Sequence, residues 1–276
     1  MKKIDSRNLD KNQLVEQSIN KKFHKTLWRP FIQAVKQYEM IQANDRIAVC
    51  VSGGKDSFLN AKLLQMLQRH SDVPFELVFL QMDPGYNEQN RQKIRENAAL
   101  LNIPLTVFQT DIFEVTESVG GSPCYLCARM RRGYLYAKAR ELGCSKIALG
   151  HHLSDVIETT LMGMFYGSQL QAMLPKLHSR NFEGMTLIRP LYCVHEDDIR
   201  AWVRCNGLDF IRCACRFTEN VEEESKRYET KQLIRKLRET NPNIDRNIFH
   251  AIHTVHLDTF PGFKTEGEMH SFLEKF

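Results

Sequence analysis

The sequence has no apolar run that approaches the roughly 20 residues of a membrane-spanning helix. Residues 1–7 (MKKIDSR) lead into further charge rather than into the apolar core of a secretory signal. Internal repeats and low-complexity linkers are also lacking. We therefore expect a cytoplasmic protein that makes no membrane contact.

Neither sign of charge dominates this chain of 276 residues. It has 38 Lys and Arg against 33 Asp and Glu, a net charge of +5. Such an excess is compatible with a polyanionic partner but is too small to establish one. With 42% hydrophobic and 26% charged residues, the chain is expected to be globular, either one large domain or a core with smaller attachments.

An apolar segment over residues 47–51 is typical of a buried strand. It runs directly into Ser52, Gly53, Gly54, Lys55, Asp56 and Ser57. Adjacent glycines allow backbone conformations that are closed to other residues, so consecutive N–H groups can converge on an anion. The apolar residues that follow have helical spacing, which puts the positive end of a helix beside the same anion. The pattern predicts a phosphate-binding loop, although the Walker spacing of a P-loop NTPase is absent.

This loop resembles the PP-loop of the ATP pyrophosphatase superfamily, whose members cleave ATP between the α and β phosphates to adenylate a substrate. The resemblance implies that the backbone from Ser52 to Ser57, together with Lys55, holds the pyrophosphate end of ATP, with Mg²⁺ neutralising its charge. The alternative is a plain glycine turn, which has no need for a lysine, an aspartate and two serines.

Strand and helix patterns alternate beyond the loop. The expected strands cover residues 47–51, 75–80, 105–108 and 146–149, and the expected helices include 89–101, 129–141 and 153–165. Alternation of this kind predicts a parallel sheet with ligands at the C-terminal strand ends. We expect an α/β fold of the PP-loop (adenine nucleotide alpha hydrolase-like) kind with helices on both faces of the sheet. Residues 1–44 should form an N-terminal helical region, 45–190 the ATP-binding core, and 191–276 a small helical C-terminal region.

A second strand end carries polar residues. Leu149 and Gly150 lead into His151 and His152, and Asp155 follows. If this strand lies beside the first one, these side chains come next to the phosphate-binding loop, where they could bind a nucleotide or Mg²⁺. A helix N-cap at Ser154 or Asp155 with surface histidines is the alternative.

Several motifs in order extend the resemblance to the tRNA 2-thiocytidine synthetases, the TtcA family. They are residues 149–152 with Asp155, residues 164–167 (MFYG) and residues 188–191 (IRPL). The resemblance implies that Gly150, His151 and Asp155 line the ATP pocket, with Lys55 and Asp155 as the catalytic residues. It also implies 2-thiolation of cytidine at position 32 in the tRNA anticodon loop.

A C-x-x-C pair, Cys124 and Cys127, brings two thiolates within reach of one metal or of each other. Three interpretations are open from the residues alone: a redox dithiol, a zinc site completed by Cys213 and Cys215, or an iron–sulfur cluster. In a cytoplasmic chain such roles are more typical of cysteine than a disulfide framework. Four further cysteines lie in apolar or helical patterns and are expected to be structural: Cys50, Cys144, Cys193 and Cys205.

The TtcA resemblance favours a [4Fe-4S] cluster held by Cys124, Cys127 and Cys213, with one iron left open for a hydrosulfide. The family has a second C-x-x-C followed by Gly-Ser-Gln at the distal site, whereas this chain has C-x-C and then Arg216. Cys215 is therefore an alternative third ligand, or a fourth that makes the site resemble a zinc site.

Basic residues follow the cysteine pair, with Tyr134 and Tyr136 among them: Arg129, Arg131, Arg132, Lys138 and Arg140. A second basic set marks the N-terminal helical region: Lys21, Lys22, Lys25 and Arg29. Such clusters suit an RNA backbone, with aromatic rings to stack on unpaired bases, although a solvated helix face is the simpler interpretation. The expected partners are tRNA and a separate sulfur donor such as a cysteine desulfurase, and a homodimer is compatible with the sequence. Another PP-loop enzyme or a noncatalytic zinc-stabilised RNA-binding protein would share many of these features.

Overall fold

The computed structural model describes residues 9–113, 123–211 and 226–275, without the side chains of residues 123–128 and 275. Six strands form the main sheet in the order β3-β2-β1-β4-β6-β5. All neighbours are parallel except β5, which runs antiparallel to β6. The strands are β1 (Arg46–Cys50), β2 (Glu76–Asp83), β3 (Leu105–Gln109), β4 (Lys146–Ala148), β5 (Lys176–His178) and β6 (Thr186–Ile188). The sheet confirms the expected α/β fold.

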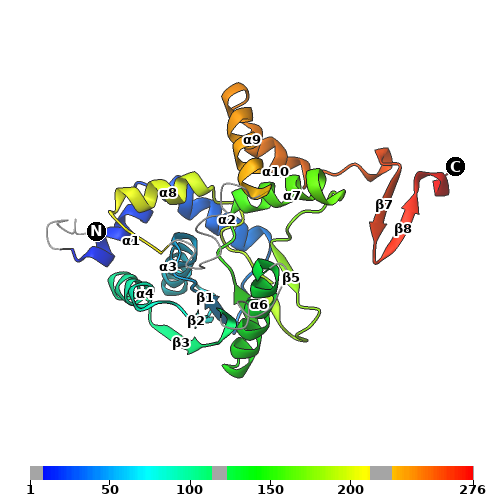
Figure 1. Cartoon of the computed structure of the whole chain (residues 1–276). Helices are drawn as coiled ribbons and strands as arrows, with labels where there is room; N and C mark the ends of the chain where they lie inside the picture. The colour runs from blue at the N-terminus through cyan, green and yellow to red at the C-terminus, as the bar shows by residue number, and fades with distance from the viewer. Residues whose placement is uncertain (1–8, 114–122, 212–225, 276) are drawn as a thin grey trace.

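Helices cover both faces of this sheet (Figure 1). They are α1 (Lys11–Asn20), α2 (Arg29–Gln37), α3 (Lys55–His70), α4 (Glu88–Leu100), α6 (Pro123–Glu141), α7 (Leu153–Gly167), α8 (Glu196–Cys205), α9 (Lys226–Thr240) and α10 (Ile244–Ala251). A π-helical turn, η2 (His24–Trp28), joins α1 to α2. The sequence pattern predicts most of these elements to within a few residues, but it does not mark α1 as a separate helix, and it misses α10 and the short strands β5 and β6.

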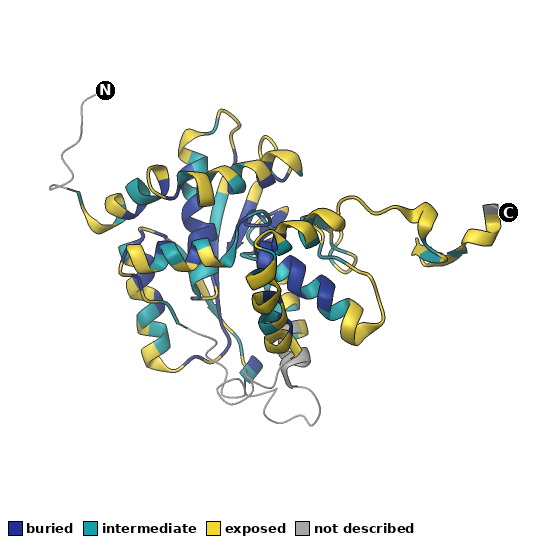
Figure 2. Ribbon diagram, turned by 90° about the horizontal axis from the view of Figure 1, so that it is seen from above, coloured by how far each residue is buried: buried dark blue, intermediate teal, exposed yellow. Residues whose placement is uncertain are grey.

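Two apolar clusters hold the helices on the sheet. The larger one lies on the face covered by α1, α2, α3, α4 and α8, and includes Phe31, Phe58 and Trp202, which are fully buried. The smaller cluster lies between the opposite face and α6, where the ring of Tyr136 stacks on Phe182 with centroids 4.9 Å apart. Figure 2 shows the resulting dark core of buried residues between exposed outer helix surfaces.

The chain reverses its direction across the sheet after β3. It first moves outward from β1 to β2 and β3 through α3 and α4, and then returns through α6 to β4, on the other side of β1. Val49 of β1 pairs with Ala148 of β4 in the parallel register. The C-terminal ends of β1 and β4 therefore meet where the strand order reverses, which is the usual ligand position in sheets of this type.

The C-terminal region joins the body through α7. Ile234 of α9 packs with Leu153, Ile157 and Leu161 of α7, and residues of α10 border the same cluster. Beyond α10, the antiparallel pair β7 (Gly262–Thr265) and β8 (Glu268–Ser271) projects away from the body (Figure 1). Among the described residues, no helix combines the length and the apolar character that crossing a membrane requires.

A buried ion pair ties the start of the sheet together and gives a test of the fold. The Lys146 ammonium lies 2.6 Å from Asp45 Oδ2 and 3.2 Å from the Met40 carbonyl, and both charged side chains are at most 10% exposed. Asp45→Ala should lower the free energy of unfolding by about 3 kcal/mol or more, because it leaves a buried ammonium uncompensated.

The matched control for this variant is Glu76→Ala, which breaks the exposed Arg46–Glu76 pair. Urea titration measures both variants, and Glu76→Ala should cost less than about 1 kcal/mol. Equal effects of the two variants would contradict the importance of the buried pair.

Candidate functional site

The loop after β1 has the form of an anion site. Gly53 has φ = +92°, a conformation that L side chains rarely adopt. A Cβ at this position would also lie 2.6 Å from Ile211 Cδ1 and 2.8 Å from Ile94 Cγ1. Gly54 precedes α3 and supplies no side-chain cap, so the first N–H groups of this helix are available to a ligand.

Hydrogen bonds within the loop preform its shape. Ser57 Oγ donates to the Gly54 carbonyl at 2.8 Å and accepts from the Ser52 amide at 3.1 Å. The Tyr86 hydroxyl, from the turn after β2, donates to the Ser52 carbonyl at 3.2 Å. Ser57 therefore ties the two ends of the loop together.

The loop after β4 lies directly on the first turn of α3. A Cβ at Gly150 would lie 3.0 Å from the Asp56 carbonyl carbon and oxygen and 3.1 Å from the Ser57 nitrogen. Only a residue without a side chain fits this approach without displacing backbone. The structure thus meets the condition set in the sequence analysis, since β4 lies beside β1 and the two strand-end motifs come together.

His152 is the N-cap of α7, a role that the sequence interpretation gives to Ser154 or Asp155. Its Nδ1 accepts from the Asp155 amide at 3.3 Å, and Asp155 Oδ2 accepts from the His152 amide at 3.0 Å. The side chain of Asp155 thereby lies at the helix start as part of a capping box, and it is His152 that approaches the loop, with Nε2 3.7 Å from Asp56 Oδ1. His151 has a buried Nδ1 with no hydrogen-bond partner among the described residues, and burial and nearby Arg189 lower its pKa to about 4.

Lys55 lies between two carboxylates. Its Nζ is 2.9 Å from Asp56 Oδ2 and 3.0 Å from Glu196 Oε1. Burial lowers the pKa of Lys55, but the two carboxylates outweigh this effect and hold it above its usual value. Glu196 begins α8, and no motif in the sequence indicates that it reaches the loop.

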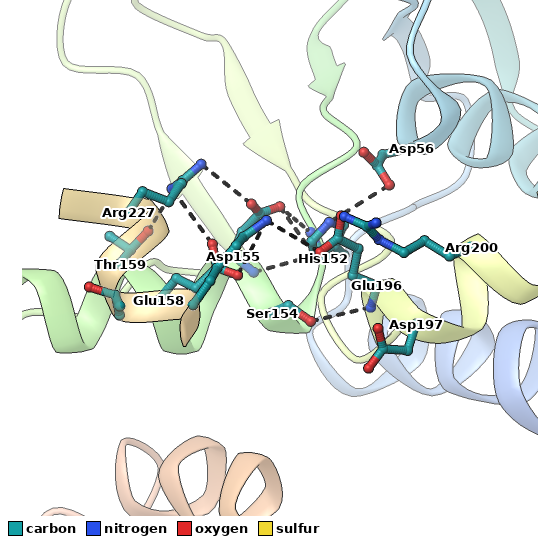
Figure 3. A network of polar contacts seen from close by, with 12 residues as sticks. Asp56, His152, Ser154, Asp155, Glu158, Thr159, Glu196, Asp197, Arg200 and Arg227 are labelled. Atoms are coloured by element: carbon teal, nitrogen blue, oxygen red, sulfur yellow. Dashed lines mark hydrogen bonds and ion pairs between the residues drawn. The ribbon is translucent and has the colours of Figure 1, made fainter. Parts of the chain in front are cut away.

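The charged network continues from this point into α9 (Figure 3). Arg227 lies 3.6 Å from both Asp155 Oδ1 and Glu158 Oε2, and Lys231 lies 3.7 Å from Glu158 Oε1. Glu158 is only 3% exposed, and burial raises its pKa to about 7 despite these two cations. The sequence does not identify Glu158, Arg227 and Lys231 as site residues. The pattern of their helices distinguishes exposed positions from core positions but does not show which charged side chains meet.

A pocket of about 520 Å³ opens at the C-terminal ends of β2 and β3. Asp83 lines the pocket, pairs with Arg91 at 2.6 Å and accepts from the amides of Gly85 and Tyr86. Tyr134 of α6 lines the same pocket. Residues of α6 and of the turn after β2 therefore line one pocket together.

The predicted cluster ligands lie in or next to parts of the chain that are not described. Cys124 and Cys127 belong to α6, but their side chains are outside the description, and Cys213 and Cys215 lie outside the described residues. Ile211, two residues before Cys213, lies against Gly53. Among the described side chains, no group of three His, Cys, Asp or Glu residues could hold a metal ion.

The other cysteines and the basic helix are described. Cys50 and Cys144 are buried, Cys193 is half-buried and Cys205 is exposed. On α6, Arg129 and Arg132 are exposed, whereas Arg131 lies over the ring of Phe113 at 5.5 Å. Arg140 is exposed but also lies over a ring, that of Phe182, at 6.0 Å.

Comparison with known proteins identifies the family. Residues 18–236 match the PP-loop domain family. The chain is 37% identical over 247 residues to the tRNA-cytidine(32) 2-sulfurtransferase of Alkalilimnicola ehrlichii, which spans 87% of this chain and 75% of that protein. It is also 37% identical over 226 residues to the protein of the same name from Syntrophotalea carbinolica. That match covers 81% of this chain and 86% of the relative. The chain belongs to the tRNA-cytidine(32) 2-sulfurtransferase family.

A solved structure supports the fold of this sulfurtransferase family member. The U34-tRNA thiolase NcsA from Methanococcus maripaludis, described with its [4Fe-4S] cluster, matches with a TM-score of 0.65 at 21% identity. The match covers 82% of this chain and 76% of the thiolase. The two proteins share the PP-loop α/β architecture.

The tight approach of the two loops gives a direct test of the ATP site. Gly150→Ala should weaken binding of a non-hydrolysable ATP analogue about tenfold or more, because the added methyl group pushes the β4 loop away from the first turn of α3. Isothermal titration calorimetry measures the affinity, and thermal unfolding checks that the variant is folded.

Gly167→Ala is the control, since a Cβ there would meet no atom within 4 Å. It should bind the analogue as the unmodified protein does. If a folded Gly150→Ala variant also binds normally, the close approach has no part in nucleotide binding.

Proposed function

We propose that the protein is an ATP-dependent tRNA sulfurtransferase that replaces the C2 oxygen of cytidine 32 with sulfur. Its family membership supports this substrate, because the relatives carry that activity in their names. The observation that carries the proposal is the contact of Ile211 with Gly53. Ile211 is two residues before Cys213, so this contact supports a single site in which nucleotide activation and sulfur transfer would both occur.

The residues around Gly53 fit the phosphates of ATP. The uncapped N-terminus of α3 offers amide donors. Lys55 is the first residue of this helix and adds a cation beside them. Asp56 Oδ1 is buried and accepts no hydrogen bond among the described residues, although His152 Nε2 lies 3.7 Å away, and such an oxygen suits a ligand of Mg²⁺. Gly150 and His151 would border the nucleotide from the β4 side, and Asp155 would lie next to the reacting groups at the start of α7.

Activation by ATP answers a leaving-group problem. The C2 oxygen of cytidine is amide-like and leaves poorly, whereas an adenylated oxygen leaves as AMP. The C2 oxygen would attack the α-phosphorus, pyrophosphate would depart, and sulfur would then bond to C2 as the C2–O bond breaks. Lys55 would stabilise the negative charge that develops on the departing pyrophosphate.

The thiolates of Cys124, Cys127 and Cys213 would hold a [4Fe-4S] cluster. Three thiolates suit such a cluster, and two of the cysteines are three residues apart on α6, the spacing that puts side chains on one face of a helix. When bound with three protein ligands, the cluster would offer one open iron to an incoming hydrosulfide. A separate sulfur donor would supply that sulfur, because no PLP-binding or rhodanese-like domain is evident in the sequence.

The tRNA would approach over α6. Arg129 and Arg132 are exposed on this helix, and Tyr134 lines the adjoining pocket. Arginine side chains suit phosphate contacts, and an exposed ring suits stacking on an unpaired base. This arrangement would guide the anticodon loop toward the helix that carries the first two cluster ligands.

Nucleoside mass spectrometry tests the substrate and the reaction together. We expect 2-thiocytidine to disappear from the tRNA of cells that lack this gene, grown without oxygen to protect a cluster, and to return when the gene is restored. Loss of a different thiolated nucleoside would show that cytidine is not the substrate and would identify the base that is. No change in any thiolated nucleoside would contradict the proposal.

Cysteine variants test the cluster. Cys124→Ser, Cys127→Ser and Cys213→Ser should each abolish thiolation and the visible absorbance of anaerobically purified protein, while ATP binding persists. Cys205→Ser is the control, because Cys205 is exposed and its sulfur contacts Lys22. Full activity of Cys213→Ser with loss in Cys215→Ser would move the third ligand to Cys215, and bound zinc without iron would contradict the cluster.

A further inference from the structure

We propose that Glu196 is a positioning residue for Lys55, which holds the ammonium at the phosphate-binding loop until ATP arrives. The inference rests on the proposed function, because it assigns Lys55 to the phosphates of ATP. Glu196 lies 141 residues further along the chain, and its Oε1 is 3.0 Å from Lys55 Nζ. It need not touch the nucleotide to affect the reaction, because it acts through the lysine.

Glu196 is itself held from several sides (Figure 3). Its amide donates to Ser154 Oγ at 3.2 Å, which joins the start of α8 to the start of α7. Its Oε1 also accepts from Arg200 at 2.8 Å, and its Oε2 pairs with Lys231 at 3.3 Å. The side chain is only 12% exposed. The carboxylate is therefore in a defined place before any ligand binds.

A second carboxylate changes what Lys55 can do. Asp56 is the next residue on the same helix and moves with Lys55, so this pair alone does not orient the lysine relative to the rest of the molecule. Glu196 comes from a separate helix and supplies an external reference point. Holding a long, flexible side chain in one place reduces the entropy that must be lost when it binds a phosphate.

The remaining partners of Glu196 allow Lys55 to leave. A buried carboxylate that loses its only cation is strongly destabilised. Glu196 keeps Arg200 and Lys231 when Lys55 turns to an anionic ligand, so the transfer does not strand a buried charge. Lys55 and Lys231 strongly lower the pKa of Glu196 against the opposing effect of burial, so the carboxylate stays ionised.

The first test separates the rate of reaction from the affinity for ATP. Glu196→Gln should slow AMP formation with saturating ATP and tRNA about tenfold or more in single turnovers. Its affinity for ATP should change less than about threefold, because loss of a nearby negative charge favours ATP while a loosened Lys55 disfavours it. A purely structural defect would lower the amplitude of the single turnover and leave its rate unchanged.

Asp197→Asn is the matched control for this variant. It removes the same charge from the next position of α8, where the side chain is 71% exposed and pairs with Arg238. Its rate and affinity should equal those of the unmodified protein. A normal rate in Glu196→Gln would overturn the inference, and so would recovery of its rate by added Mg²⁺, since that would make Glu196 a metal ligand.

Arg200→Met tests the compensation separately and should fold, because Arg200 is 45% exposed. With one cation fewer on Glu196, Lys55 is harder to release, so calorimetry should show ATP binding weakened about threefold or more relative to Asp197→Asn. Equal binding would overturn the compensation step. If the unmodified protein forms no AMP with tRNA, the proposed function fails. The calorimetric comparison of Arg200→Met with Asp197→Asn still decides whether Glu196 restrains Lys55.

Discussion

The parallel pairing of β1 with β4 is the constraint on which the site depends. The chain travels outward through β2 and β3 before α6 returns it beside β1, so the loops that follow β1 and β4 leave the sheet at the same edge. Gly150 then lies against the backbone of Asp56 at a distance that leaves no room for a side chain. A shift of β4 relative to β1 would separate the two loops and remove one wall of the proposed nucleotide site.

Charge compensation connects this edge to the C-terminal region. Glu158 of α7 is buried and Glu196 of α8 is partly buried, and both pair with cations of α9, which begins after the segment that carries Cys213 and Cys215. Removing carboxylates from water is costly, so the basic side chains of α9 offset part of this cost beside the site. The attachment of α9 is thus coupled to the position of Lys55 through Glu196, within the described residues.

Much of the fold could be predicted from local pattern. The apolar run before Ser52, the glycine pair and the helical spacing after Lys55 each depend on a few neighbouring residues, and the structure has a strand, a turn with positive φ at Gly53 and a helix at those positions. The short strands β5 and β6 were missed because three residues carry too little periodicity to distinguish them from a loop. His152 was missed as a helix cap because serine and aspartate are the more usual caps.

The sequence by itself determined the phosphate-binding loop, the alternating strands and helices, and the family, because backbone conformation and apolar periodicity are set by residues that are close together in the chain. Only the tertiary structure decided which charges meet. Glu196 reaches Lys55, and Arg227 and Lys231 reach Glu158, across separations that no sequence spacing encodes. The physical reason is that an ion pair depends on the distance between two atoms in space, and that distance follows from the strand order and the packing of α7, α8 and α9.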